Sequence, residues 1–277
     1  MWKPPARAVP ASSLPSVQVT FLGTGTSQGI PMIGCTCAVC RSTDPHDKRF
    51  RASIVVTQDD GTQVLVDTTP DLRSQALTWG LTRVDAVVYT HSHADHIFGL
   101  DELRRFIALR GGGTMGIHGD AHTIDDIHRI FDYAFSSPPE MGGGVPRLVS
   151  SVIDGPFQVA GTRWTPIPIL HGRRTIFGYR IGDFAYLTDC SRVPDETWPL
   201  LDGVEVLVIG ALRDRPHPTH LSLPEAMEVA GRVGARQTYF THMCHDLGHA
   251  TTNARLPEGM ALAYDGLSVS LPAAASS

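Results

Sequence analysis

The fold of this 277-residue chain is decided by the stretch His91-Ser92-His93-Ala94-Asp95-His96. It places three imidazoles and a carboxylate directly after the apolar run Val84–Thr90, whose β-branched residues are typical of a buried strand. Packing does not explain a strand that ends in four such side chains, because imidazole and carboxylate are the ligands that borderline and hard divalent cations prefer. The stretch therefore predicts a metal site.

The spacing within this stretch divides its side chains between two ions. His91 and His93 lie two residues apart on extended chain, so they project to the same side and can share one ion. Asp95 and His96 follow where the chain should turn into a helix, and they can reach a second ion beside the first.

Composition and charge limit the class of protein. Hydrophobic residues make up 42% of the chain and charged residues 18%, which describes an ordinary globular protein with a sizeable core. The formal net charge of −5 argues against a general nucleic-acid binder, so no stable nucleic-acid complex is expected. A small phosphorylated substrate is compatible with this charge, since bound cations would dominate the local field.

The two ends of the chain show no export or membrane signal. Residues 1–16 hold four prolines and no apolar signal core, and we expect a flexible lead-in there. No segment approaches the roughly 20 apolar residues that span a bilayer, and residues 272–277 are expected to be a flexible tail. A cytoplasmic location, no membrane partner and a single domain over residues 17–271 are therefore expected.

Apolar strands that alternate with helical patterns predict the architecture. The predicted strands are Val17–Leu22, Ser53–Thr57, Val64–Val66, Val84–Thr90, Thr165–Ile169, Thr175–Ile181, Phe184–Leu187, Val204–Ile209 and Gln237–Thr241. The predicted helices are Pro70–Trp79, His96–Leu109, His122–Phe135, Pro194–Leu201 and Pro224–Val233, the last with Ser222 as N-cap. Early strands joined by a turn at residues 59–61, then strands alternating with helices, predict an α/β fold with four αββα layers.

Two glycine-rich stretches interrupt this pattern. Residues 111–113 should join a helix to a strand. Residues 138–146 are either a solvated loop or a mobile flap beside the site, and the sequence leaves both alternatives open.

Further metal ligands must come from elsewhere in the chain, because one stretch cannot satisfy two ions. His171, Asp189 and His242 each follow an apolar strand. Polar residues that end strands in this way share one rim of a sandwich, and this shared placement makes the three residues candidate ligands.

The order of these residues resembles the ligand motifs of the metallo-β-lactamase superfamily, and the match covers nearly the whole chain. The resemblance implies the metallo-β-lactamase fold. It gives His91, His93 and His171 to the first ion, Asp95, His96 and His242 to the second, and Asp189 as the bridge. It says little about the substrate, because the superfamily includes hydrolases, nucleases and oxidoreductases.

Two cations roughly 3.5–4 Å apart would explain hydrolysis without a side-chain nucleophile. A water that bridges them becomes hydroxide near neutrality, and a phosphoryl or carbonyl oxygen bound to one ion is polarised toward attack. Asp189 would hold the ions at this spacing and reduce their repulsion, and we count Asp95 among the catalytic residues. The sequence shows no nucleophile elbow that leads from a strand into a helix, and no Walker loop.

A second cluster, Gly34-Cys35-Thr36-Cys37-Ala38-Val39-Cys40, carries three thiols within six residues. Three cysteines and one further ligand make a closed tetrahedral zinc site. With five cysteines and no export signal, metal ligation is favoured over disulfides. His245 is the preferred fourth ligand, and Cys244 is the alternative.

The segment Phe21–Pro31 and the cysteines after it resemble the phosphoribosyl 1,2-cyclic phosphate phosphodiesterases of the carbon–phosphorus lyase pathway. In that family a Cys3His zinc site lies beside the catalytic pair, and its histidine follows the last active-site histidine by three residues. His242-Met243-Cys244-His245 matches this spacing. One short loop would then present His242 to the catalytic ions and His245 to the structural zinc, whose binding contributes folding free energy.

A departing alkoxide needs a proton, and His220 is the candidate donor. It lies just before the predicted helix Pro224–Val233, where the resembling family places a histidine that assists the leaving group or steadies the phosphate. His217 is the alternative acid. Arg213 and Arg215 could bind phosphate or lie in a solvated loop.

The preferred function is a binuclear metal-dependent hydrolase that cleaves a phosphodiester, with a small cyclic or nucleotide-like phosphate as substrate. Zinc, manganese or iron would form the catalytic pair, with one structural zinc. The resemblance also allows a homodimer.

Three alternatives belong to other functional classes. A nuclease or transfer-RNA-processing enzyme of the same fold normally needs a basic arm, and the chain has no Lys/Arg-rich insertion. Flavin-linked di-iron oxidoreductases carry a glutamate where His93 stands. A non-enzymatic zinc protein, similar to a relative in quinone-cofactor biosynthesis, is disfavoured because every catalytic ligand is present here.

Overall fold

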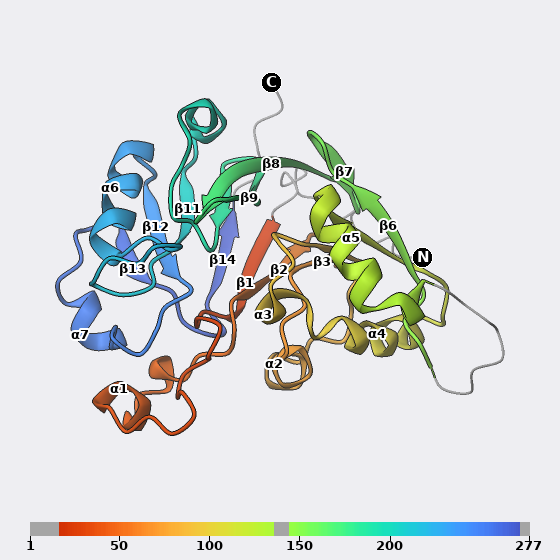
Figure 1. Cartoon of the computed structure of the whole chain (residues 1–277), viewed down its shortest axis with the longest axis horizontal. Helices are drawn as coiled ribbons and strands as arrows, with labels where there is room; N and C mark the ends of the chain where they lie inside the picture. Colours follow the sequence, from red (N-terminus) through yellow and green to blue (C-terminus); the bar gives the residue numbers. More distant parts are fainter. Residues whose placement is uncertain (1–16, 136–143, 272–277) are drawn as a thin grey trace, which may run out of the picture.

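The structure is a computed structural model that describes residues 17–135 and 144–271. Two seven-stranded sheets face each other, and helices cover their outer faces (Figure 1). This arrangement confirms the predicted αββα sandwich. The predicted lead-in at residues 1–16, the tail at residues 272–277 and most of the predicted flap at residues 138–146 lie outside the described residues. The single domain over residues 17–271 stays a prediction.

The first sheet comes mainly from the N-terminal half of the chain. Its strands in spatial order are β14 (Ser268–Leu271), β1 (Val17–Gly23), β2 (Ser53–Gln58), β3 (Gln63–Val66), β4 (Ala86–Val88), β5 (Met115–Gly119) and β6 (Leu148–Val152). The strands from β14 to β3 pair antiparallel, and those from β3 to β6 pair parallel. The predicted turn at residues 59–61 joins β2 to β3, as expected for a hairpin.

The second sheet comes from the C-terminal half. Its strands in spatial order are β13 (Met260–Leu262), β12 (Gln237–Thr241), β11 (Val206–Gly210), β10 (Phe184–Leu187), β9 (Arg174–Ile181), β8 (Thr162–His171) and β7 (Phe157–Val159). The strands from β7 to β10 pair antiparallel, whereas those from β10 to β13 pair parallel. Each sheet therefore has one parallel half, and His91, Asp189 and His242 of the site follow strands in these halves, whereas His171 ends the antiparallel strand β8.

Alternating side chains along the central strands bury both faces of each sheet. In β3, Val64 and Val66 pack in the core between the two sheets, while Leu65 packs in the core under the helices. Trp164 and Tyr179 of the second sheet, both 1% exposed, fill the space between the sheets. A strand covered on both faces must be apolar throughout, which is why these strands are continuous hydrophobic runs in the sequence.

Helices close the two outer faces (Figure 1). On the first sheet they are α2 (Leu72–Trp79), α3 (Ala94–Ile97), α4 (Leu103–Leu109) and α5 (Ala121–Ile130), and on the second sheet α6 (Leu223–Val233). Ser222 caps α6 as predicted, in a capping box with Glu225. None of the helices in the described part of the chain combines the length and apolar character that crossing a bilayer requires.

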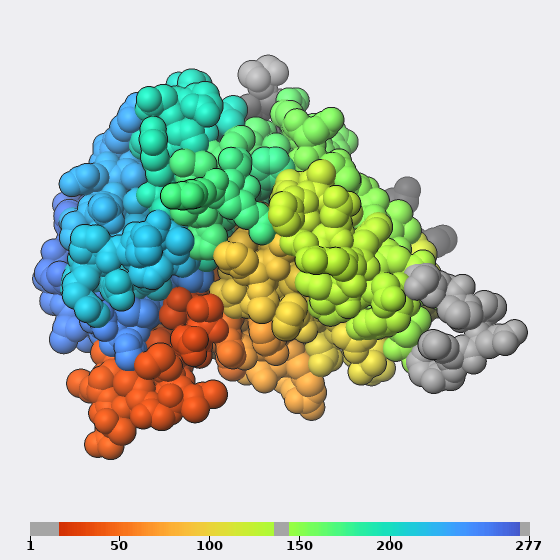
Figure 2. All heavy atoms as spheres, viewed as in Figure 1, coloured from red at the N-terminus to blue at the C-terminus, as the bar shows by residue number. Residues whose placement is uncertain are grey.

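Two short helices follow the cysteine motif and the strand β12. They are α1 (Ala38–Arg41) and α7 (His249–Asn253). Figure 2 shows the segment around α1, in orange-red, projecting from the body beside the blue C-terminal segments. Four short 3₁₀ helices complete the described elements: η1 (Pro45–Asp47), η2 (Leu100–Glu102), η3 (Asp132–Ala134) and η4 (Asp195–Leu201).

Several predicted elements differ from the structure. The helix predicted over His96–Leu109 is divided at Gly99, which packs so closely on the backbone of Thr69 that a side chain there would collide. The helix predicted over Pro194–Leu201 is the 3₁₀ helix η4, with a proline inside it. The strand predicted over Val84–Thr90 pairs only at its centre, and the helix predicted over His122–Phe135 ends at Ile130 as α5. The strands β5, β6, β7, β13 and β14 are absent from the prediction.

Candidate metal centre

The candidate site lies where strands of the two sheets end in polar residues. His91 comes three residues after β4, Asp189 two residues after β10, and His242 directly after β12. These strands lie in the parallel halves of their sheets, whose carboxyl ends gather at one edge. His171 is the last residue of β8. These candidate ligands therefore lie at strand ends, as the sequence pattern predicted.

His91, His93 and His171 form the first group of candidate ligands. One ring nitrogen of each lies within 4.8 Å of the others. The ring centroid of His91 is 4.6 Å from that of His93 and 5.4 Å from that of His171. This is the set that the resemblance gave to the first ion.

Asp95, His96, Asp189 and His242 form the second group, again with one ligand atom each within 4.8 Å of the others. His96 Nε2 lies 3.2 Å from Asp95 Oδ2 and 3.3 Å from Asp189 Oδ2. His242 Nε2 lies 3.2 Å from Asp189 Oδ1. Asp189 also forms a group with His171 and His220, so its carboxylate lies between the two histidine sets.

The donor set fits a pair of divalent cations. Nitrogen atoms of His91, His96 and His242 are buried and form no well-directed hydrogen bond among the described residues, although carboxylate oxygens lie 3.2 Å from His96 Nε2 and from His242 Nε2. Such atoms are normally satisfied in a folded protein, and a metal ion is one way to satisfy them. Neutral imidazole and carboxylate oxygen are also the ligand types that zinc, manganese and iron accept. Which ion each residue binds stays a prediction.

The electrostatics of the site favour positive charge at its centre. Burial alone would lower the pKa of His96, but the carboxylates of Asp95, Asp189 and Asp67 outweigh it and raise that pKa well above its ordinary value. Burial lowers the pKa of His91 well below its usual range, and the nearby His96 adds to this effect. His91 is therefore held in the neutral form that metal coordination requires.

Hydrogen bonds at the far side of the His171 and His91 rings turn the other nitrogen of each ring toward the cluster. His171 Nδ1 lies 2.7 Å from the carbonyl oxygen of Thr219, to which it can donate. His91 Nδ1 lies 3.1 Å from the hydroxyl of Thr90. Partners of this kind fix the ring orientation and the tautomer of metal-binding histidines.

Asp67 contacts a candidate metal ligand, and the sequence motifs did not identify it. It directly follows β3, is fully buried, and its Oδ2 lies 2.8 Å from His96 Nδ1. The backbone N–H and the hydroxyl of Thr90 also donate to its carboxylate. The signal was in the sequence, because Asp67 ends an apolar strand just as Asp189 and His242 do.

The backbone is strained at three of these strand ends. Asp67, Asp189 and His242 have φ angles of 66°, 56° and 56°. Positive φ is unfavourable for residues with a Cβ and costs about 1–3 kcal/mol where it persists. Three such residues at one rim indicate that the two sheets hold the backbone in the conformation that directs these side chains to a common centre.

His220, the candidate proton donor, lies beside the second group, and its role stays a prediction. Its ring stacks on His242 at a centroid distance of 4.9 Å, and its Nδ1 lies 3.7 Å from Asp189 Oδ1. Burial lowers the pKa of His220 to about 3, and the proximity of His242 adds to the shift. His217, the alternative acid, is next to it at a ring distance of 5.2 Å.

The two arginines considered for phosphate binding have protein partners. Arg213 donates to the carbonyl oxygens of Arg215 and Pro216. Arg215 forms an ion pair of 2.9 Å with Asp246. Arg213 is held by its own loop and Arg215 by the loop after β12, which favours the second of the two predicted alternatives.

The cysteine motif forms a separate group with His245. The Nδ1 atom of His245 lies 3.1, 3.7 and 3.6 Å from the sulfur atoms of Cys35, Cys37 and Cys40. Cys244, the alternative fourth ligand, is outside this group. The backbone N–H of Cys40 lowers the pKa of Cys37. Burial raises the pKa of Cys40 to about 11, so a bound cation would be needed to favour the thiolate form of Cys40.

A buried arginine links the cysteine segment to the loop after β12. Arg49 is 2% exposed and donates to the carbonyl oxygens of Cys244 and Leu247. Met243 exchanges backbone hydrogen bonds with Thr24 and Thr26. The short segment from His242 to His245 is thus fixed from both sides, and it connects the two candidate metal groups.

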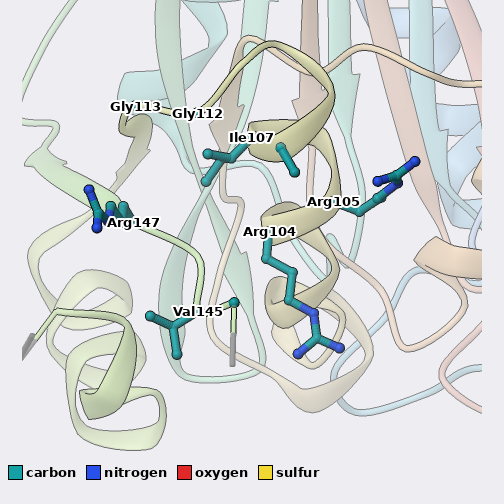
Figure 3. Close-up of a pocket in the computed structure, with 9 residues that line it drawn as sticks. Arg104, Arg105, Ile107, Gly112, Gly113, Val145 and Arg147 are labelled. Carbon is teal, nitrogen blue, oxygen red and sulfur yellow. The ribbon is translucent and has the colours of Figure 1, made fainter. Parts of the chain in front are cut away.

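A surface hollow elsewhere in the structure is not the candidate site. It lies between α4 and residues 112–113 and 144–147, and Arg104, Arg105 and Arg147 line it (Figure 3). Figure 3 shows their side chains pointing in different directions, and Arg104 pairs with Asp101 at 2.9 Å. Because these cations do not converge and no predicted site residue lines the hollow, we assign no function to it.

Comparison with known proteins shows where this arrangement occurs. A family model described as a beta-lactamase superfamily domain matches residues 62–243. A solved structure described as a new diphosphatase from the PhnP family is 43% identical, with a TM-score of 0.86 over 92% of this chain and 97% of that chain. Zinc-bound PqqB from Methylobacterium extorquens has a TM-score of 0.68 at 19% identity, over 91% of this chain and 99% of that one, which shows the fold alone.

One curated relative is much longer than this chain. An octanoyltransferase of Porphyromonas gingivalis is 38% identical over 252 residues, which are 89% of this chain but 50% of that protein. The chain thus spans half the length of this relative.

Asp67→Asn should weaken metal binding by about 10- to 100-fold, because an amide cannot hold the His96 ring as the carboxylate does. Asparagine tolerates positive φ, so the backbone conformation is kept. Competition with a chromogenic chelator measures the affinity. Asp85→Asn is the matched control, since Asp85 precedes β4 and His91 follows it, so that Asp85 lies at the end of β4 away from the candidate ligands. Wild-type affinity in Asp67→Asn would contradict the positioning role of Asp67.

Cys37→Ser should lower the metal content by about one ion per chain and reduce activity, because the loop that carries His242 loosens. Elemental analysis and turnover measure the two effects. Cys244→Ser serves as the control and should keep the full metal content. The coupling is wrong if Cys37→Ser retains both full activity and all of its metal.

Proposed function

This chain belongs to the beta-lactamase superfamily and, within it, to the PhnP family, and on that premise we propose that it is a binuclear metal-dependent hydrolase of phosphodiester bonds. The observation that supports this most is the convergence of seven predicted ligands into two adjacent groups, with Asp189 in the second group and also close to His171 of the first. A cytoplasmic location and a small phosphorylated substrate belong to the same proposal.

The chain offers ligands for two catalytic ions and one structural ion. His91, His93 and His171 would hold the first, and Asp95, His96 and His242 the second, with Asp189 between them. Two divalent ions in such a site supply Lewis-acid activation of water and of a phosphoryl oxygen. Cys35, Cys37, Cys40 and His245 would hold a structural zinc.

The protein groups around the cluster orient the reaction. Asp67 fixes His96, and the hydroxyl of Thr188 donates to Asp189 Oδ2 at 2.8 Å, which leaves Oδ1 facing His220 and His242. Because its pKa is lowered to about 3, His220 is neutral at pH 7. A neutral imidazole can still donate an N–H hydrogen bond, so we assign His220 the role of steadying a phosphoryl or leaving-group oxygen rather than that of an imidazolium acid.

Two observations support a small substrate. The net charge of −5 does not favour a polyanionic partner, and no Lys/Arg-rich insertion is present in the sequence. The diphosphatase described for the 43% identical structure supports a phosphate bond as the target. Octanoyl transfer is outside the proposal, because the relative with that name is twice as long as the matched region.

The metal-loaded protein should hydrolyse bis(p-nitrophenyl) phosphate, a cyclic nucleotide or a diphosphate diester, and it should lose this activity when a chelator removes the catalytic ions. Elemental analysis of the same preparation should find about three ions per chain. Asp189→Asn, which removes the charge between the two groups, should be inactive. A fully loaded protein that hydrolyses none of these compounds would refute the proposal, and a mobility shift with transfer RNA would then favour the nuclease alternative.

His220→Ala should keep its metal ions and lose turnover by about 100-fold or more, because the ring lies beside His242 and Asp189 but is not one of the seven ligands that the resemblance gives to the two ions. The catalytic constant is measured with an alkyl ester, whose leaving group is poor. His217→Ala, which changes the neighbouring imidazole, should stay near the wild-type rate. An unchanged catalytic constant in His220→Ala would remove this residue from the reaction.

A further inference from the structure

The turn at residues 24–26 lies between β1 and the cysteine segment, and the proposed function gives it no role. Two of its backbone N–H groups are already used inside the protein. Gly25 donates to the carbonyl oxygen of Phe50 at 2.7 Å, and Thr26 donates to that of Met243 at 3.0 Å. A Cβ on Gly25 would lie only 3.0 Å from the Phe50 carbonyl oxygen, so the turn is packed tightly on this segment. The turn therefore supports its neighbours and does not present these amides to a ligand.

The turn holds the residue that follows His242. The backbone N–H of Met243 donates to the carbonyl oxygen of Thr24 at 3.0 Å, and its carbonyl oxygen accepts from Thr26. Met243 is completely buried in a core of the second sheet. His242 itself has a φ of 56°, a conformation that persists only where the surrounding structure enforces it. The direction of the His242 ring therefore depends on how firmly the turn is held.

Asp265, which lies between β13 and β14, binds both the turn and the segment on which it packs. Its Oδ1 atom accepts a hydrogen bond of 2.7 Å from the hydroxyl of Thr24. Its Oδ2 atom accepts one of 2.6 Å from the backbone N–H of Phe50. Thr24 is completely buried, so its hydroxyl depends on a protein partner. One carboxylate thus fastens together segments that are far apart in the sequence.

We propose that Asp265 is a positioning residue of the metal centre, which acts through Thr24 and Met243 to hold the His242 ring toward the second ion. The inference rests on the proposed function, because it requires a metal ion at the second ligand group. Asp265 belongs to neither catalytic group of candidate ligands, so its effect passes through the backbone on either side of His242.

The cysteine group has a support of its own. Arg49, and not Asp265, donates to the carbonyl oxygen of Cys244, the residue before His245. Loss of the Asp265 contacts should therefore loosen the second catalytic ion more than the structural ion. A role in general stability would instead affect both kinds of ion alike.

Cobalt(II) distinguishes the two kinds of site without a substrate. Cobalt bound by thiolates has an intense sulfur-to-metal charge-transfer band, which cobalt bound by imidazole and carboxylate lacks. Stepwise addition of a chelator to the cobalt-loaded full chain therefore follows the structural and the catalytic ions separately. Asp265→Ala and Thr24→Val should release catalytic cobalt at a chelator concentration about tenfold lower than wild type does, with the charge-transfer band retained as in wild type.

Asp265→Asn should restore most of the affinity that Asp265→Ala loses. Its Oδ1 atom can accept from the N–H of Phe50, and its Nδ2 atom can donate to the hydroxyl of Thr24. Burial already raises the pKa of Asp265 to about 7, so a neutral side chain is suited to this position.

Thr20→Val is the matched control, because it removes a threonine hydroxyl that bonds to Ser268 at 2.8 Å, away from the turn at residues 24–26. It should release both kinds of cobalt as wild type does. If Asp265→Ala does not fold, Thr24→Val decides, since valine keeps the shape of threonine.

The inference is overturned if Asp265→Ala and Thr24→Val release catalytic cobalt as wild type does. It is equally overturned if they release both kinds of cobalt together with a lowered Tm. A wild type that binds cobalt only at the cysteine group would refute both the inference and the proposed function. A wild type that binds catalytic cobalt, loses it as described in the variants and hydrolyses no phosphodiester would refute the proposed function alone.

Discussion

The buried negative charge at the rim between the two sheets is the constraint on which the rest of the site depends. Asp67 and Asp189 are almost completely buried, and Asp95 lies against His96 and His242. A carboxylate removed from water costs several kcal/mol unless it is paired. The same cluster contains imidazole nitrogens that lack a partner among the described residues. Divalent cations satisfy both requirements at once, since they offset the carboxylate charge and accept the free imidazole lone pairs.

The scaffold holds these groups together against local backbone strain. The left-handed conformations at Asp67, Asp189 and His242 persist because each follows a strand whose two faces are packed in separate cores. The loop after β12 adds a second support, because Arg49 and the turn at residues 24–26 bind its backbone. These few hydrogen bonds therefore link the two candidate metal groups. Arg174 reaches the metal centre from the β8–β9 hairpin on the other side.

Much of the fold and of the site could be predicted from local patterns. The strand ends at His171, Asp189 and His242 could be found because apolar runs that stop at a polar residue are visible without a structure. Asp67 shows the limit of this approach. It also ends an apolar strand, but its carboxylate contacts the candidate ligand His96, and the spacing of metal-ligand motifs does not include such second contacts. The break at Gly99 could not be predicted either, since it results from close packing on Thr69, a residue 30 positions away.

The donor chemistry follows from residue type and order: three imidazoles and a carboxylate in six residues, three thiols in six others, and strands apolar enough to be buried on both faces. The packing of the two sheets places Asp189 between the two histidine groups, directs His245 and not Cys244 toward the thiols, and directs Arg174 toward Ser92. The physical reason is that residue type sets what a side chain can bind. Distances between residues far apart in the chain depend on how the two sheets pack, and no local pattern contains that information.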